Sequence, residues 1–430
     1  MRINFRSRKT WVIAAIAAIA TLVGVLLYMN LVAGEKRIQH QLPRLYETND
    51  TEFRRSLSSL LGPPLVEGNH VETLVNGDQI FPAMLAAIRS ARSTITFETY
   101  IYWSGEIGRE FVQALAERAQ AGVKVHVLLD WVGSIKMEPA LLEQMRAAGI
   151  EVERFHEPHW RNWSKLNNRT HRKLLVVDGA VGFTGGVGIA DQWLGDARNP
   201  DEWRDTHFRI VGPVVAQMQS VFLDNWMRAT GKVLHGEAYF PSLKPAGTYA
   251  AQMFSSSPSG GSESMQLMYL LAITAARRTI DLSNSYFVPD EMTIQTLMDA
   301  ARRGVKVRVI TPNGHIDSET VRKASRGSWG PMLRAGIEIA EYAPTMYHVK
   351  GLVVDGVFSS VGSTNFDNRS FRLNDEANLN VLDAGFGRVQ AQVFERDWAE
   401  AKKITLQDWE NRPLVERLWE RLARVLHTQL

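Results

Sequence analysis

Two short segments of the chain carry the same pattern of histidine, lysine and aspartate. One runs from His171 to Asp178 as His-Arg-Lys-Leu-Leu-Val-Val-Asp, and the other from His348 to Asp355 as His-Val-Lys-Gly-Leu-Val-Val-Asp. Side chains two residues apart in a strand point to the same face, so each copy aims an imidazole and an ammonium group at one point. Two such pairs brought together supply a nucleophile, a proton donor and two fixed positive charges. These are the groups that cleavage of a phosphodiester requires when no metal takes part.

The elements that must position these groups form an internal repeat. Residues 87–102 match residues 272–287, and each block reads as the end of a helix, an arginine-containing turn and a strand. A further helix then ends at Gly122 or Gly304, the residue type expected after a helix, and a strand with alternating valines follows. Strands that alternate with helices predict a largely parallel sheet flanked by helices, once per half. We therefore expect an α/β protein built from two similar halves.

The context of the motifs resembles the phospholipase D superfamily and, within it, the bacterial cardiolipin synthases. The residues that carry this resemblance are Asn168-Arg-Thr-His-Arg-Lys173, Ser285-Tyr-Phe-Val-Pro-Asp290, Gly362 to Ser370, and Asn374-Asp-Glu376-Ala-Asn. The resemblance implies a bilobal fold with one active site at the interface of the halves. It also implies a covalent phosphohistidine route with no metal or other cofactor. One departure is Gly188, which stands where the family usually has an asparagine.

Catalytic roles follow from this resemblance. It implies His171 as the nucleophile and His348 as the general acid and base, a choice that the sequence alone leaves open. Lys173 and Lys350 would hold the non-bridging phosphate oxygens as fixed ammonium charges. We include the aspartates that end the motifs, Asp178 and Asp355, in the catalytic set. Because they lie an odd number of residues from the histidines, we expect them to support the turns.

Five further residues are candidates for binding the phosphate. Glycines without a side chain would let it approach the backbone closely, and a hydroxyl and an amide could add hydrogen bonds. These residues are Gly185, Gly186, Gly362, Ser363 and Asn365.

Each histidine also needs an acceptor for its far ring nitrogen. Asp205 lies downstream of His171, and Glu376 lies at a similar distance downstream of His348, so we expect one pairing inside each half. The aromatic residues Trp160, Trp163, Tyr286 and Tyr347 flank the reactive strands and could line a channel or pack in the core.

An apolar stretch from Trp11 to Val32 follows four basic residues, Arg2, Arg6, Arg8 and Lys9. About 20 apolar residues span a bilayer as a helix, and the apolar region of a cleaved signal peptide is shorter. We therefore expect a single-pass anchor in the bacterial cell (inner) membrane. The basic residues before this stretch favour a non-cytoplasmic location for the rest of the chain.

The expected organisation is an anchor (1–33), a juxtamembrane stalk (34–66), a first half (67–245), a second half (246–403) and an amphipathic C-terminal helix (404–430). The chain has 430 residues and no cysteine, which excludes disulfides and thiolate metal sites. Its net charge of +3 argues against a dedicated nucleic-acid binder.

The leading hypothesis, drawn from the resemblance and the expected anchor, is a phosphatidyltransferase. Two molecules of phosphatidylglycerol, an anionic phospholipid, would give cardiolipin and glycerol. A phospholipase D that uses water, or a membrane-tethered nuclease, would share the same first step. A lipid-binding scaffold without activity is a third hypothesis, motivated by Gly188. The sequence does not indicate an oligomeric state.

Overall fold

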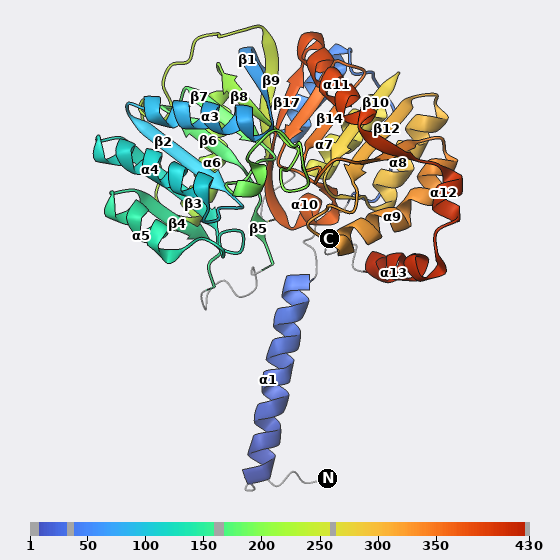
Figure 1. Ribbon diagram of the computed structural model, residues 1–430, viewed down its shortest axis with the longest axis horizontal. Coiled ribbons are helices and arrows are strands. Elements are labelled where there is room, and N and C mark those ends of the chain that lie inside the picture. Colours follow the sequence, from blue (N-terminus) through green and yellow to red (C-terminus); the bar gives the residue numbers. More distant parts are fainter. Residues whose placement is uncertain (1–7, 32–37, 159–166, 259–263, 426–430) are drawn as a thin grey trace.

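The computed structural model describes residues 8–31, 38–158, 167–258 and 264–425 of the chain. Figure 1 shows two α/β lobes side by side, with helix α1 (Arg8–Leu31) outside them. The first lobe consists of β1 (Val66–Val75), α3 (Asn76–Ser90), β2 (Thr94–Thr99), α4 (Glu106–Gln120), β3 (Lys124–Asp130), α5 (Pro139–Ala147), β4 (Glu151–Phe155), β5 (Arg169–Thr170), β6 (Leu174–Val177), β7 (Val181–Gly185), η2 (Asp191–Trp193), β8 (Thr206–Val211) and α6 (Val215–Thr230).

The second lobe repeats this order. It consists of β9 (Tyr249–Ser256), α7 (Met265–Ala275), β10 (Thr279–Asn284), β11 (Phe287–Val288), α8 (Glu291–Arg302), β12 (Lys306–Pro312), α9 (Glu319–Arg334), β13 (Glu338–Tyr342), β14 (Lys350–Val354), β15 (Phe358–Gly362), β16 (Phe366–Asp367), α10 (Asn368–Arg372), β17 (Asn374–Leu382) and α11 (Ala384–Ala399). Strand β18 (Ala401–Ile404) and helices α12 (Leu406–Glu410) and α13 (Leu414–Val425) follow.

One continuous sheet runs through both lobes. Within the described residues it has sixteen strands, in the order β18-β13-β12-β10-β14-β15-β17-β9-β1-β8-β7-β6-β2-β3-β4, with β5 paired to β17. The central strands β1 and β9 pair with each other in antiparallel orientation. The strand order is therefore the same on both sides of this centre, which confirms the predicted repeat of two α/β halves.

The expectation of a largely parallel sheet is wrong for half of each lobe. Strands β2, β3 and β4 are parallel, as are β10, β12 and β13. Strands β6, β7 and β8 are antiparallel, as are β14, β15 and β17. The short turns after the two histidine motifs account for the pairs β6–β7 and β14–β15, because a connection of a few residues can join only antiparallel neighbours.

Apolar side chains cover both faces of the sheet. On the first lobe, α3, α4 and α5 pack on one face through Phe81, Phe111 and Met145. On the other face, α6 packs through Phe222 and Trp226 against strands of both lobes, in a cluster that includes residues of β9 and β17. A buried helix that contacts both halves holds them in a fixed relation, which a site at their interface requires.

The predicted membrane anchor is wrong, and with it the predicted single-pass placement in the cell membrane. In the part of the chain that the structure describes, no helix is both long and apolar enough to cross a bilayer. A span needs both properties in one helix, and α1 covers most of the apolar stretch that led to the prediction. Residues 1–7 and 32–33 of the expected anchor lie outside the described residues.

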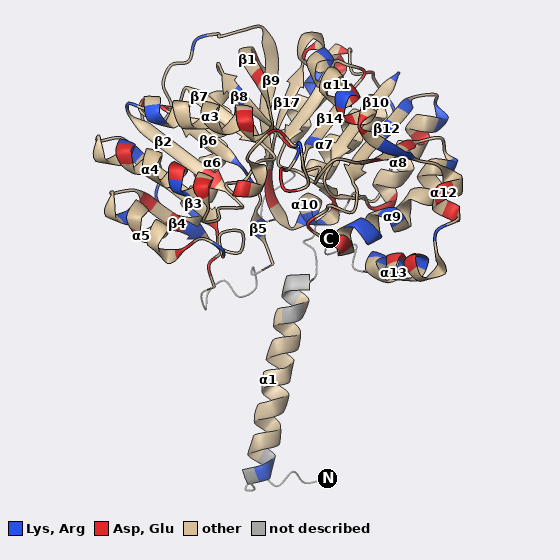
Figure 2. Cartoon of the chain, viewed as in Figure 1, with Lys and Arg blue, Asp and Glu red and all other residues tan. Residues whose placement is uncertain are grey.

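Two flanking segments lie on the second lobe. Residues Thr51–Leu61, part of the expected stalk, form α2, whose Phe53, Leu57 and Leu61 are fully buried in the core of that lobe. At the other end, α13 packs beside α9, with Ala423 and Glu420 buried and Leu418 exposed. Figure 2 shows acidic and basic residues mixed along α13 and the other outer helices, with neither lobe dominated by one sign.

Candidate active site

The two histidine motifs meet at one cavity between the lobes. His171 lies between β5 and β6, and its backbone N–H donates to the carbonyl of Asp375 in the second lobe (2.9 Å). His348 lies just before β14, and its N–H donates to the carbonyl of Arg204 in the first lobe (2.8 Å). Both imidazoles line a cavity of about 660 Å³. Each histidine segment is thus held in place by the backbone of the opposite half.

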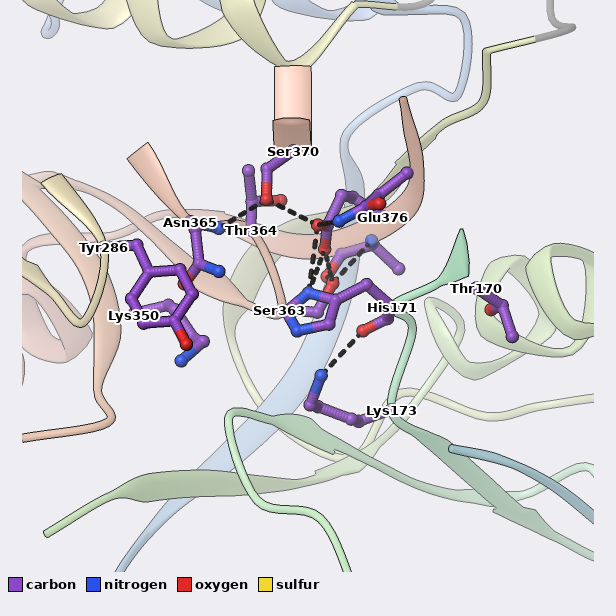
Figure 3. A network of polar contacts seen from close by, with 12 residues as sticks. Thr170, His171, Lys173, Tyr286, Lys350, Ser363, Thr364, Asn365, Ser370 and Glu376 are labelled. Atoms are coloured by element: carbon purple, nitrogen blue, oxygen red, sulfur yellow. Dashed lines mark hydrogen bonds and ion pairs between the residues drawn. The ribbon is translucent and has the colours of Figure 1, made fainter. Parts of the chain in front are cut away.

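Each imidazole is oriented by a carboxylate that comes from the opposite half. The Nδ1 atom of His171 lies 3.0 and 3.1 Å from the two carboxylate oxygens of Glu376 (Figure 3). The Nδ1 atom of His348 lies 2.8 Å from Oδ2 of Asp205. With Nδ1 engaged, Nε2 of His171 is the nitrogen available for chemistry, and Nε2 of His348 lies 3.1 Å from Nζ of Lys350. The predicted acceptors are both used, but their partners are exchanged relative to the expected pairing within each half.

Hydroxyl and amide groups fix the carboxylate of Glu376. Ser363 donates its hydroxyl to Oε2 (2.5 Å), and Ser370 donates to Oε1 (2.7 Å), as Figure 3 shows. The Nδ2 group of Asn374 also donates to Oε1 (3.3 Å). Burial alone would raise the pKa of Glu376, but His171, Lys173 and the hydroxyl of Ser363 lower it below its ordinary value. Glu376 is therefore a fixed, ionised acceptor for His171.

The carboxylate of Asp205 is held in a similar way. It accepts hydrogen bonds from the indole Nε1 of Trp193 (3.0 Å) and from the backbone N–H of Thr206 (2.8 Å). Burial raises the pKa of Asp205 to about 6, although the charge of Lys350 opposes this. Asp205 is thus ionised at neutral pH and is positioned by groups that do not themselves enter the cavity.

The two lysines of the motifs lie beside their histidines. Lys173 donates to the carbonyl of His171 (2.8 Å), and Lys350 donates to the carbonyl of His348 (2.7 Å) and to the hydroxyl of Ser285 (2.6 Å). Burial lowers the pKa of Lys173 to about 7 and that of Lys350 to about 8. An ammonium has three hydrogens. Lys173 uses one of them on the carbonyl of His171, whereas Nζ of Lys350 also lies 3.1 Å from both ring nitrogens of His348 and must turn from them to bind a phosphate oxygen.

Burial keeps both imidazoles neutral in the free site. It lowers the pKa of His171 to about 4, against the opposing charge of Glu376. Burial also lowers the pKa of His348 well below its ordinary value, and Lys350 and Lys173 lower it further. A neutral imidazole with a free Nε2 is nucleophilic. A bound anion would raise both pKa values, because an opposite charge nearby favours the protonated ring.

The aspartates that end the two motifs lie away from the cavity. Asp178 accepts hydrogen bonds from the backbone N–H groups of Arg92, Ser93 and Thr94 (2.7–3.2 Å). Asp355 accepts from the equivalent groups of Arg277, Arg278 and Thr279 (2.6–3.0 Å) and from the hydroxyl of Thr48 (2.9 Å). Both stand at positive φ, 52° and 55°. The interpretation as turn supports agrees with these contacts, whereas a place in the catalytic set does not.

Among the five candidate phosphate ligands, the structure brings only Asn365 into the cavity lining. A side chain at Gly186 would collide with the carboxylate of Asp205, and one at Gly362 with the carbonyl of Ala377. A side chain at Gly185 would collide with His207. Ser363 donates its hydroxyl to Glu376. The glycines thus make room for neighbouring protein groups, and this is a correction to the expected close approach of phosphate to their backbone.

Aromatic residues near the histidines were largely missed by the sequence reasoning. The ring of Tyr100 lies 5.1 Å from that of His171, and the rings of Trp193 and Trp203 lie 5.2 and 5.6 Å from that of His348. The internal repeat held a signal for one of them, because Tyr100 occupies the place of Ser285 in the matched blocks. Tyr100 lies beside Lys173 in the first half, and Ser285 lies beside Lys350 in the second half.

The flanking aromatic residues named from the sequence lie in different environments. Tyr286 lines the cavity and donates its hydroxyl to Asp317 (2.8 Å). Tyr347 is fully buried in the core and donates to Asp397 (3.0 Å). Trp160 and Trp163 lie outside the described residues. Within the described residues, no group of three or more histidine, aspartate or glutamate side chains could hold a metal ion.

Comparisons with known proteins agree with this geometry. The family model described as "Cardiolipin synthase, PLD-like domain" matches residues 84–223 and 269–398, one range in each lobe. Cardiolipin synthase A of Pseudomonas putida is 35% identical over 373 residues, which are 86% of this chain and 77% of that protein. The protein of the same name from Pseudomonas entomophila is 35% identical over 381 residues, or 88% of this chain and 79% of that one.

A solved structure shares the fold. The phosphatidylserine synthase of Haemophilus influenzae superposes with a TM-score of 0.66 at 15% identity, covering 88% of this chain and 100% of that chain. Two motifs meet at one cavity, and the family model matches most of the chain in two ranges. On this evidence the chain belongs to the family of cardiolipin synthases with phospholipase D-like domains.

Proposed function

We propose that this protein is a phosphatidyltransferase that converts two molecules of phosphatidylglycerol into cardiolipin and glycerol. The observation that carries the proposal is the meeting of the two imidazoles in one cavity, each with Nδ1 held by a buried carboxylate. The relatives named cardiolipin synthase A support the choice of reaction. The site has a nucleophile, a proton carrier and two ammonium groups, which suffice for a two-step transfer.

In the first step, Nε2 of neutral His171 attacks the phosphorus of phosphatidylglycerol. The bond from phosphorus to the glycerol oxygen breaks as the bond from phosphorus to nitrogen forms, and a proton from His348 goes to the departing glycerol. His348 acquires that proton when the bound phosphodiester raises its pKa. Glu376 stabilises the positive charge that develops on His171, and Lys173 and Lys350 stabilise the charge on the phosphate oxygens.

In the second step, His348 removes a proton from a glycerol hydroxyl of the second phosphatidylglycerol. That oxygen attacks the phosphorus and the bond from phosphorus to His171 breaks. Protonated His348 then releases to solvent the proton that it gained on substrate binding, which restores the neutral free site. Asn365, which lines the cavity, is the candidate amide donor to the transferred phosphate. Asp178 and Asp355 act as supports for the turns. The two halves, proposed as residues 67–245 and 246–403, contribute one histidine and one lysine each.

A product assay tests this function directly. Purified full-length protein is incubated with vesicles that contain phosphatidylglycerol, and the lipid products are identified by mass spectrometry. Cardiolipin and free glycerol in equal amounts are expected. Phosphatidic acid in place of cardiolipin would identify a phospholipase D that uses water. Cleavage of a single-stranded oligonucleotide in a parallel reaction, with no lipid product, would identify a nuclease.

A further inference from the structure

A pair of arginines from opposite halves lies in the same cavity as the histidines. Arg169, on β5, and Arg369, on α10, both line it. Strand β5 pairs with β17, with Arg169 beside Asn374, so this cavity wall is built across the interface. Neither arginine belongs to the two His-x-Lys motifs, and the two-step transfer above gives them no role.

Neighbouring peptide groups hold both guanidinium groups in position. Arg169 donates to the carbonyl of Asn168 (2.8 Å). Arg369 donates to the carbonyl of Asn167 (2.7 Å) and to its side-chain oxygen (3.1 Å). Both arginines are thus held by the segment that leads into β5.

The two guanidinium groups act electrostatically on each other and on Tyr100. Burial lowers the pKa of Arg169, Asp130 opposes this, and the charge of Arg369 lowers it further. Burial raises the pKa of Tyr100, whose ring lies 5.1 Å from that of His171, and both arginines oppose this rise. Two like charges in one cavity repel each other, and a bound anion would relieve that repulsion.

The other charged groups of the cavity do not remove this positive charge. Its described lining carries Lys136, Arg169, Lys173 and Arg369 against two acids, Asp317 and Asp367. Burial raises the pKa of Asp367 to about 7 and lowers that of Lys173 to about 7, so both groups are only partly ionised at neutral pH. The cavity is therefore cationic beyond what one phosphate at the His-Lys centre requires.

We propose that Arg169 and Arg369 form a second phosphate subsite, which binds the phosphodiester of the acceptor lipid while its glycerol hydroxyl attacks the phosphohistidine. This inference rests on the proposed function and specifies its acceptor. The two phosphates of the product are separated only by one glycerol, so the acceptor's own phosphate must enter the same cavity as the phosphorus on His171. Paired guanidinium groups suit a phosphodiester because each carries a permanent positive charge and five N–H donors in a planar group.

The test compares an anionic acceptor with a neutral acceptor for the same phosphohistidine. Vesicles of phosphatidylglycerol in phosphatidylcholine are supplied with isotope-labelled glycerol. Labelled phosphatidylglycerol reports transfer to neutral glycerol, and cardiolipin reports transfer to the anionic lipid. Full-length Arg169→Gln and Arg369→Gln variants are measured against the parent protein. Arg146→Gln, on the exposed surface of α5, is the matched control.

We expect each glutamine variant to lose cardiolipin formation by about 10- to 100-fold, the effect of removing a hydrogen bond to a charged group. Glycerol exchange should remain within about 3-fold of the parent, because it needs no second phosphate. Arg369→Lys keeps the charge but not the planar set of donors, so its rate of cardiolipin formation should lie between those of the parent and Arg369→Gln. If a glutamine variant does not fold, Arg369→Lys is measured in its place.

Three results would overturn the subsite. One is an equal loss of both products in the folded variants, which would assign the arginines to the first step. Another is an unchanged ratio of cardiolipin to exchanged glycerol. The third is an equal loss in Arg146→Gln. Failure of the proposed function is distinguishable from all of these, because the parent protein itself would then form no cardiolipin.

Discussion

The imidazole of His171, in the first half, is hydrogen-bonded through Nδ1 to the carboxylate of Glu376, in the second half, at 3.0 Å. The reverse exchange joins His348 to Asp205 at 2.8 Å. Neither half therefore contains a complete pair of histidine and carboxylate. This arrangement makes the reaction centre dependent on the docking of the two halves, and it accounts for the polar groups buried where they meet.

The exchanged pairing predicts which step each carboxylate supports. Glu376→Gln removes the charge that stabilises protonated His171 and allows the wrong tautomer, so we expect kcat to fall by about 10²- to 10⁴-fold. Rapid-quench mass spectrometry of the intact protein should show slow formation of the phosphohistidine. Asp205→Asn should slow proton transfer by His348 instead. If Glu376→Gln affected only the breakdown of the intermediate, the assignment of His171 as the nucleophile would be wrong.

Replacement of each histidine by alanine is predicted to block a different step of the reaction. His171→Ala should abolish turnover and leave no covalent adduct, because the attacking nitrogen is gone. His348→Ala should also abolish turnover of phosphatidylglycerol. With a phosphatidyl ester of p-nitrophenol, whose leaving group needs no proton, His348→Ala should release nitrophenol once per enzyme and accumulate an adduct on His171. Peptide mapping locates that adduct, and its appearance on another residue would contradict the assignment.

The pKa of Lys173 predicts the alkaline side of the pH profile. Burial lowers this pKa to about 7, so the ammonium is present below that pH and is lost as the pH rises. Because kcat/KM reports the free enzyme, in which His348 has already lost its proton at acid pH, we expect kcat/KM to fall more steeply above about pH 7, where Lys173 also loses its charge. The value of kcat should persist to higher pH, since the bound phosphodiester raises the pKa of Lys173. On the acid side, His171 with its pKa of about 4 should limit kcat/KM only near that pH. A kcat/KM that stays flat to pH 9 would exclude a required Lys173 ammonium.

The aspartates at the ends of the motifs are predicted to stabilise the fold. Asp178→Asn keeps a residue that tolerates positive φ but loses the charge that accepts three backbone N–H groups. We expect the free energy of unfolding to fall by about 1–3 kcal/mol, with kcat of the folded protein nearly unchanged. Chemical denaturation and steady-state kinetics on the same preparation check this. A large loss of kcat with normal stability would return Asp178 to the catalytic set.

Metal independence is predicted from the identity of the reacting groups. The two imidazoles and two ammonium groups supply a nucleophile, a proton carrier and positive charge at the phosphate, so every role in the proposed steps is filled by a side chain. Incubation with EDTA, followed by removal of the chelator, should leave the rate of cardiolipin formation unchanged. A loss of activity that added divalent cation restores would contradict the prediction.

Several features were readable from the sequence because they depend on neighbours along the chain. The spacing of two residues predicted that Lys173 lies beside His171 and Lys350 beside His348, as their contacts show, although His171, Lys173 and His348 lie just outside strands β6 and β14. The matched order of helices, glycines and strands predicted the two halves. The odd spacing of Asp178 and Asp355 predicted that they support turns. Such local rules do not depend on how distant segments pair, which is why they carried over to the structure.

Tertiary structure alone decided the partners of these groups. The exchange of Glu376 and Asp205 between the histidines follows from the contact of β5 with β17 and of His348 with Arg204, which join residues far apart in sequence. Long-range packing also gave Gly186 and Gly362 their role beside neighbouring groups, and it brought Arg169 and Arg369 into one cavity. An apolar run likewise did not suffice to predict the anchor. Spacing along a chain specifies which way side chains point, but the partner that each one meets depends on the docking of the two lobes.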